Sequence, residues 1–167
     1  MLCKRFVVFL ILLTGLTGFF GCVTYSPYRE NLIRRAKQED IPIIVSDITV
    51  YAPNSVGGVD VGINIINTSN YAFKYVILTL VPYNRVGDIA PSHIGNRTNA
   101  NIKIVGSIEP YADYLMSIWE NVWDNGTIDC VKLENIEIMY MNDKVEIVRG
   151  HKLTKVFSSN VNESICR

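Results

Sequence analysis

The chain has 167 residues, enough for one domain with a sizeable core. Its basic and acidic residues both number 16, and removing Lys4 and Arg5 with the N-terminal leader leaves 14 basic against 16 acidic residues. This balance excludes the broad basic field that attracts nucleic acid, so we expect no nucleic-acid partner.

Residues 1–21 have the layout of a secretory signal peptide. Lys4 and Arg5 form a short positive region, an apolar core follows, and the small Gly21 precedes Cys22. The apolar run is too short to cross a hydrocarbon core of about 30 Å comfortably as a helix. Export followed by attachment at Cys22 is therefore the predicted fate of the chain.

The junction at Cys22 resembles the lipobox of bacterial lipoproteins. In that family the leader is cut before a cysteine, which carries a diacylglycerol on its thiol and an acyl chain on its new amine. Gly21 fits the box, whereas Phe19 and Phe20 stand where a leucine and a small residue are usual. The resemblance implies that acyl chains of the palmitate type on Cys22 hold the protein in a membrane of the bacterial cell envelope, without specifying which membrane. An uncleaved apolar anchor and a leader cut elsewhere are the alternatives.

Residues 22–42 are predicted to form a membrane-proximal tether. The basic side chains of this stretch are Arg29, Arg34, Arg35 and Lys37. They could touch anionic lipid headgroups, but acidic neighbours dilute that attraction, and a solvated short helix or linker is the interpretation we favour. Pro42 then ends any helix.

Residues 59–65 alternate apolar and polar side chains, the pattern of a half-buried strand. The residues that we expect to face the core are Val59, Val61, Ile63 and Ile65. The polar run 67–70 predicts a turn. Residues 73–83 are apolar on both faces, which indicates a central strand, and Pro82 should mark the end of its ladder pairing.

Further strands are predicted at residues 43–51, 102–105, 114–119, 131–140 and 145–148. In the first of them Ile44, Ile48 and Val50 share one face by parity, and a parity change near Asn135 predicts a bulge. About seven short strands separated by turns predict an all-β fold, a single antiparallel immunoglobulin-like β-sandwich over residues 43–157 with a polar tail at 158–167.

The segment 59–88 resembles the bacterial FxLYD type of immunoglobulin-like domain. The matching pieces are Asn67-Thr68-Ser69, the apolar run 75–81, Tyr83-Asn84 and Gly87-Asp88. Asn84 stands where the family has aspartate, and Pro82 where it has leucine. The resemblance implies a secreted, often lipid-anchored domain, and it implies no catalytic residues.

The sequence offers few groups for chemistry. His93 and His151 are far apart and lack a neighbouring cysteine or carboxylate cluster, so we expect no metal site and no cofactor. Trp119 and Trp123 close the end of the core in the interpretation we favour. In the alternative they join Tyr83 in contacting a glycan or another small ligand.

Two cysteines remain once Cys3 leaves with the leader and Cys22 carries lipid. Cys130 and Cys166 form an even pair outside the cytoplasm, where a disulfide is allowed. The sequence does not decide whether they come close enough to bond.

These observations predict a lipid-anchored, non-catalytic envelope or cell-surface protein, an interaction or structural module whose partner is a protein or a glycan. The alternative is a module that binds a glycan or small ligand through exposed aromatic residues. An unrecognised hydrolase is a third and weaker hypothesis.

Overall fold

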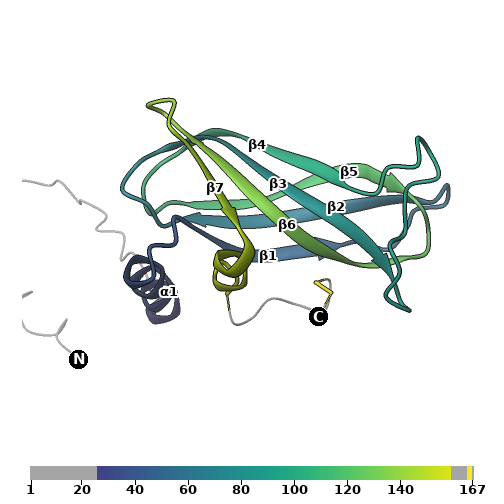
Figure 1. The fold of residues 1–167 in the computed structure, drawn as a ribbon, viewed down its shortest axis with the longest axis horizontal. Coiled ribbons are helices and arrows are strands. Elements are labelled where there is room, and N and C mark those ends of the chain that lie inside the picture. Colours follow the sequence, from purple (N-terminus) through teal and green to yellow (C-terminus); the bar gives the residue numbers. More distant parts are fainter. Residues whose placement is uncertain (1–25, 159–164, 167) are drawn as a thin grey trace, which may run out of the picture.

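The structure is a computed structural model that describes residues 26–158, 165 and 166. Two antiparallel sheets pack face to face, with a helix at one end of the sandwich (Figure 1). The strands are β1 (Ile43–Val50), β2 (Gly58–Asn67), β3 (Phe73–Asn84), β4 (Ala100–Ile108), β5 (Asp113–Asp124), β6 (Ile128–Tyr140) and β7 (Val145–Arg149). The helix α1 (Pro27–Gln38) precedes them, and a 3-10 helix, η1 (Gly150–Lys155), follows.

The strand order is β1-β2-β5 in one sheet and β4-β3-β6-β7 in the other. The third, sixth and seventh strands share a sheet, and the first, second and fifth form the opposite sheet, which is the immunoglobulin connectivity. The fourth strand lies beside the third, and β3 and β6 pair along most of their length. The predicted all-β immunoglobulin-like sandwich is therefore confirmed.

The alternation of β2 places its apolar side chains in the core. Val59, Val61, Ile63 and Ile65 are all 0% exposed, as predicted. Their register on β5 brings Trp123 opposite Val59 and Trp119 opposite Val61, so the two tryptophans extend the same layer.

The predicted face of β1 is wrong for Ile44. The pairing of β1 with β2 shifts between Val45 and Asp47, so that a bulge reverses the parity of the strand. Ile48 pairs with core-facing Ile63, whereas Ile44 pairs with Ile66 on the outer side of the sheet. The predicted bulge near Asn135 is present, because Thr79 pairs with Asn135 and the next residue of β3 already pairs with Leu133.

Pro82 does not end the ladder of β3. The pairing with β6 continues through Pro82 to Asn84. The carbonyl of Pro82 accepts a hydrogen bond from the amide of Ala90. This bond lies on the β4 side of β3, beyond Leu80, where the pairing of β3 with β4 stops. Because the N and O of one strand residue point to the same side, the missing N–H of Pro82 costs no bond to β6.

Helix α1 packs on the outer face of the three-stranded sheet. Ile44 and Ile66 point to that face by register, yet they are 0% and 6% exposed, and α1 buries Leu32 and Ala36. The helix therefore covers an apolar patch, and the segment is not simply a solvated linker. Within residues 26–158, no helix has the length and apolar character needed to cross a membrane.

Candidate functional site

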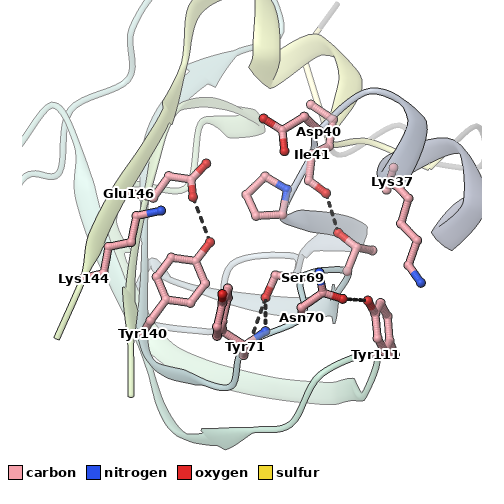
Figure 2. A pocket seen from close by; sticks show the side chains of 13 residues that line it. Lys37, Asp40, Ile41, Ser69, Asn70, Tyr71, Tyr111, Tyr140, Lys144 and Glu146 are labelled. Atoms are coloured by element: carbon pink, nitrogen blue, oxygen red, sulfur yellow. Dashed lines mark hydrogen bonds between the residues drawn. The ribbon is translucent and has the colours of Figure 1, made fainter. Parts of the chain in front are cut away.

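A cleft of about 500 Å³ lies at the end of the sandwich where α1 meets β1 (Figure 2). Three turns line it, because β2–β3, β4–β5 and β6–β7 all reverse direction at this end. The residues that carry its chemistry are Lys37, Asp40, Ser69, Asn70, Tyr71, Tyr111, Tyr140, Lys144 and Glu146.

The β2–β3 turn is held by the buried Asn67. Its amide nitrogen donates hydrogen bonds to the carbonyls of Tyr71 and Ile108, both at 2.9 Å, and its oxygen accepts from the amide and hydroxyl of Ser69. The hydroxyl of Thr68 donates to the carbonyl of Ile41 at 2.6 Å. The Asn-Thr-Ser motif thus fixes one wall of the cleft to the chain that leaves α1.

Tyr140 forms the floor of the cleft, and Tyr71 forms an aromatic edge. The two rings meet edge to face with centroids 6.0 Å apart, and Tyr71 is 61% exposed. The hydroxyl of Tyr140 donates to Glu146 at 2.8 Å. Burial raises the pKa of Tyr140 above its usual value of 10.0, and the bond to Glu146 raises it further, so this hydroxyl remains a hydrogen-bond donor at neutral pH.

Tyr111 forms the opposite side of the cleft. Its residue adopts a φ of +62°, and its hydroxyl donates to the side-chain oxygen of Asn70. The ammonium group of Lys37 lies 4.0 Å from the centre of the Tyr111 ring, a cation–π contact between α1 and the β4–β5 turn.

The charges around the cleft balance. Lys37 and Lys144 supply two positive charges, and Asp40 and Glu146 supply two negative charges. Aromatic edges with hydrogen-bonding groups of both kinds and no excess charge suit a neutral polar ligand, which stacks on tyrosine and exchanges hydrogen bonds with the rim.

The aromatic residues singled out from the sequence do not gather in one place. Trp123 is 0% exposed, so its ring cannot contact a ligand, and Trp119 is partly buried against the core. Tyr83 pairs with Cys130 near the end of β3 that lies away from the cleft. The tryptophans therefore fill the core, and Tyr83 does not join them in a site.

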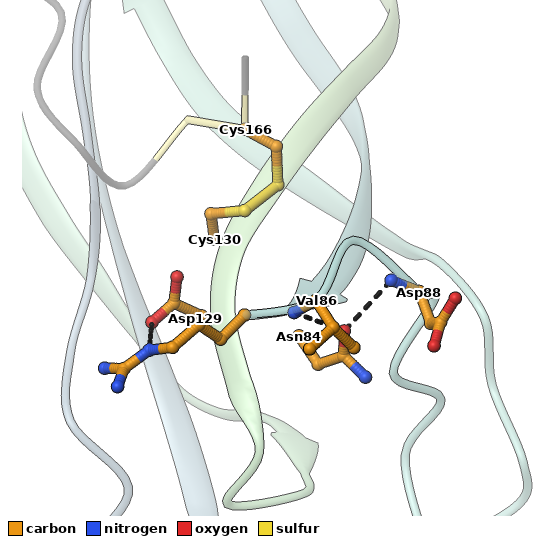
Figure 3. Close-up of a disulfide and its surroundings, with 7 residues drawn as sticks. Asn84, Val86, Asp88, Asp129, Cys130 and Cys166 are labelled. Carbon is orange, nitrogen blue, oxygen red and sulfur yellow. Dashed lines mark hydrogen bonds and ion pairs between the residues drawn. A yellow bond between two sulfur atoms is a disulfide. The ribbon is translucent and has the colours of Figure 1, made fainter.

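A disulfide links Cys130 on β6 to Cys166, with an S–S distance of 2.02 Å and a Cα–Cα distance of 5.3 Å (Figure 3). Beside it the amide of Cys166 donates to the carbonyl of Val131 at 3.0 Å. The bond joins Cys166 to β6 of the four-stranded sheet. Cys22, the predicted lipidation site, lies outside the described residues.

Within the described part of the chain, no group of three or more histidine, cysteine, aspartate or glutamate side chains is arranged to hold a metal ion. His93 lies in the loop between β3 and β4, and His151 lies in η1. The two histidines thus belong to separate segments of the fold.

The sequence did not single out the cleft, because its lining comes from four segments far apart in the chain. A weak signal was present: Tyr71, Tyr111 and Tyr140 each lie at a turn between strands, and the immunoglobulin connectivity brings those three turns to one end. Comparisons with protein families, curated proteins and solved structures found no match.

Proposed function

We propose that the protein is a lipid-anchored, non-catalytic module of the bacterial cell envelope, displayed on the membrane for interaction with a partner. The observation that carries this proposal is the docking of α1 on the sandwich. A helix that follows the predicted lipidated cysteine and packs on the domain holds the domain at the membrane surface in a defined orientation.

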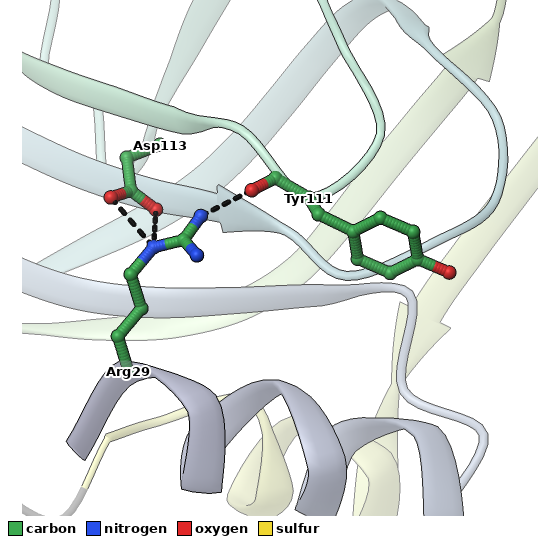
Figure 4. Close-up of polar contacts among 3 residues, drawn as sticks. All are labelled: Arg29, Tyr111 and Asp113. Carbon is green, nitrogen blue, oxygen red and sulfur yellow. Dashed lines mark hydrogen bonds and ion pairs between the residues drawn. The ribbon is translucent and has the colours of Figure 1, made fainter. Parts of the chain in front are cut away.

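The first link between α1 and the sandwich is Arg29. Its Nε donates to both carboxylate oxygens of Asp113 at 2.9 Å, and its Nη2 donates to the carbonyl of Tyr111 (Figure 4). These bonds hold the N-terminal turn of the helix against the start of β5.

The other end of α1 is held by the C-terminal segment. Arg35 donates to the carbonyl of Phe157 at 3.0 Å, and Lys155 lies 3.1 Å from Glu39. Because both ends are fixed, the buried Leu32 and Ala36 stay over the sheet.

The distance from anchor to domain is short. Pro27, the first residue of α1, follows Cys22 by five positions. A fully extended stretch of this length reaches at most about 18 Å. In our proposal the cleft end of the sandwich lies close to the membrane, and the far end of the strands points away from it.

The anchor is tested by labelling cells with radioactive palmitate. Wild type should be labelled and should have Cys22 as its mature N-terminus, whereas Cys22→Ser should remain unlabelled and be left uncleaved or released. Equal labelling of both proteins, or a mature N-terminus elsewhere, would overturn the anchor.

A second candidate function is the binding of a neutral glycan in the cleft. It is favoured by the exposed ring of Tyr71 beside the hydroxyls of Tyr111 and Tyr140, with balanced charge around them. A sugar presents an apolar face that stacks on such a ring and hydroxyls that bond to the rim.

A thermal-shift screen with glucose and N-acetylglucosamine oligomers tests the cleft. Binding should raise the melting temperature of wild type and of Tyr83→Ala, which lies away from the cleft, but not of Tyr71→Ala. A rise that survives Tyr71→Ala and is lost in Tyr83→Ala would place the ligand elsewhere and contradict this candidate.

A further inference from the structure

An apolar row crosses all four strands on the outer face of the β4-β3-β6-β7 sheet. The register pairs Val105 with Tyr75, Tyr75 with Met139, and Met139 with Val145, so these four side chains lie side by side. Val105 and Val145, at the two edges, are 62% and 46% exposed. A contiguous apolar row of this width on a sheet face indicates an interaction surface.

The neighbouring row alternates apolar and charged side chains. Its members across the four strands are Lys103, Ile77, Glu137 and Ile147. Ile147 is 53% exposed and extends the apolar surface. Glu137 takes part in none of the ion pairs found among the described residues, and the ammonium of Lys103 rests 3.9 Å from the ring centre of Tyr75.

The outer face of the other sheet differs. It carries the polar Asp47, Thr49 and Asn64 along β1 and β2, α1 covers its apolar end, and its exposed Ile118 lies on the edge strand β5. The four-stranded sheet has no such cover over Val105 and Val145, because both helices of the described chain lie elsewhere (Figure 1).

We propose that this face binds the same face of a second copy of the chain, with a two-fold axis parallel to the strands. Such an axis keeps each row opposite itself and exchanges the edges of the sheet. Val105 then lies over Val145 of the second copy, and Tyr75 over Met139 of the second copy. The whole apolar row is covered by its own counterpart.

The charges are complementary about this axis. With the axis parallel to the strands, Lys103 lies one strand away from Glu137 of the second copy, and the symmetry forms this ion pair twice. An axis across the strands through the row of Lys103 and Glu137 would instead place each of these two side chains over its own equivalent in the second copy. Like charges placed so close would oppose association.

Self-association through this face is separate from the proposed anchoring function, because its partner is a second copy of the chain and the contact does not depend on lipid. Facing sheets pack about 10 Å apart, too far for a direct disulfide, so a short bismaleimide is the suitable reagent. Full-length Val105→Cys with one epitope tag and full-length Val145→Cys with another are coexpressed, and the mixed dimer is detected on denaturing gels.

The mixed dimer should form between Val105→Cys and Val145→Cys chains. Most of it should be lost when Leu115→Cys replaces Val145→Cys, because Leu115 lies on β5 of the other sheet, where it is 80% exposed. The parent chain without added cysteines measures the background. Equal yield with Leu115→Cys would overturn the proposal, and so would a preference of Val105→Cys for its own kind.

Charge reversal supplies the second arm. Lys103→Glu and Glu137→Lys should each reduce the mixed dimer, and the double variant should restore it, because the ion pair is rebuilt with its sign exchanged. Failure of the double variant to recover would overturn the axis. When Cys22→Ser is added to both chains, the crosslinked mixed dimer should still form. Its loss would show that the crosslink reflects crowding on the membrane, and that result would overturn the proposed contact.

Discussion

Asn67 and Asn84 each stabilise a turn, at opposite ends of β3, through the side-chain oxygen, but the two residues differ in burial and in their other hydrogen bonds. The oxygen of Asn84 accepts bonds from the amides of Val86 and Asp88, and that residue is half-buried (Figure 3). Asn67 is fully buried, and its nitrogen also donates to the carbonyls of two separate segments.

Asn67→Ala should therefore lower the free energy of unfolding by about 3 kcal/mol, since the buried bond to the carbonyl of Ile108 and the part-buried bond to the carbonyl of Tyr71 are both lost. Asn84→Ala should cost less than about 1 kcal/mol, because water replaces the lost bonds. Urea unfolding of both variants checks the difference. Equal losses would show that the nitrogen of Asn67 contributes nothing.

Arg29→Ala should loosen α1 with little effect on global stability. The side chains of Arg29 and Asp113 are 32% and 40% exposed, so their pair contributes about 1 kcal/mol or less. Amide hydrogen exchange should rise in residues 27–38 and stay unchanged in β2. Arg34→Ala is the control, because Arg34 bonds Asn31 on the same helix. Similar exchange in both variants would argue against a docking role for Arg29.

Ile63→Asp should unfold the domain. Ile63 is 0% exposed in the centre of β2, and an uncompensated buried charge costs about 3–5 kcal/mol, a large part of the stability of a domain. Ile118→Asp is the control, because Ile118 is 53% exposed on β5. Circular dichroism should show a folded Ile118→Asp and an unfolded Ile63→Asp, and a native melt of the latter would contradict the register.

Local patterns predicted the core of this fold well. The alternation in β2 is decided by its own side chains, so Val59 to Ile65 could be assigned without knowing their partners. The bulge of β6 was also visible, because a parity change at Asn135 is written in the sequence.

The face of β1 could not be predicted, because distant residues decide it. The amide of Val45 donates to the carbonyl of Val156, and its carbonyl accepts from the amide of Ser158. These bonds to the C-terminal segment accompany the bulge that turns Ile44 towards α1. The cleft was missed for a similar reason, since tertiary structure alone brings Tyr71, Tyr111 and Tyr140 together.

The disulfide should stabilise the folded chain. Cys130 and Cys166 are 36 positions apart, and closing a loop of this size contributes about 2–4 kcal/mol. Reduction of the wild type should lower the melting temperature, and the double variant Cys130→Ser/Cys166→Ser should show the same decrease, because both changes remove the same bond. Mass spectrometry of the exported protein without reductant should show the linked peptides. Two thiols that react with iodoacetamide without denaturant would rule the bond out.

Tyr140 should make the fold sensitive to alkali. Its pKa is raised in the folded state, first by burial and then by its bond to Glu146, while the unfolded chain keeps the usual value of 10.0. Above pH 10.0 the unfolded state therefore releases a proton that the folded state retains. Stability from this group is fully present below that pH and falls as the pH rises through the alkaline range.

Tyr140→Phe removes this titration but also the bond to Glu146. The variant should be less stable than wild type at pH 7, by about 1–2 kcal/mol, because the hydrogen bond from Tyr140 to Glu146 is lost. Between pH 9 and pH 11, wild type should lose melting temperature more steeply than Tyr140→Phe, so the gap between them should narrow. Parallel losses over this range would show that Tyr140 ionises alike in the folded and unfolded chains, and the floor of the cleft would then be open to water.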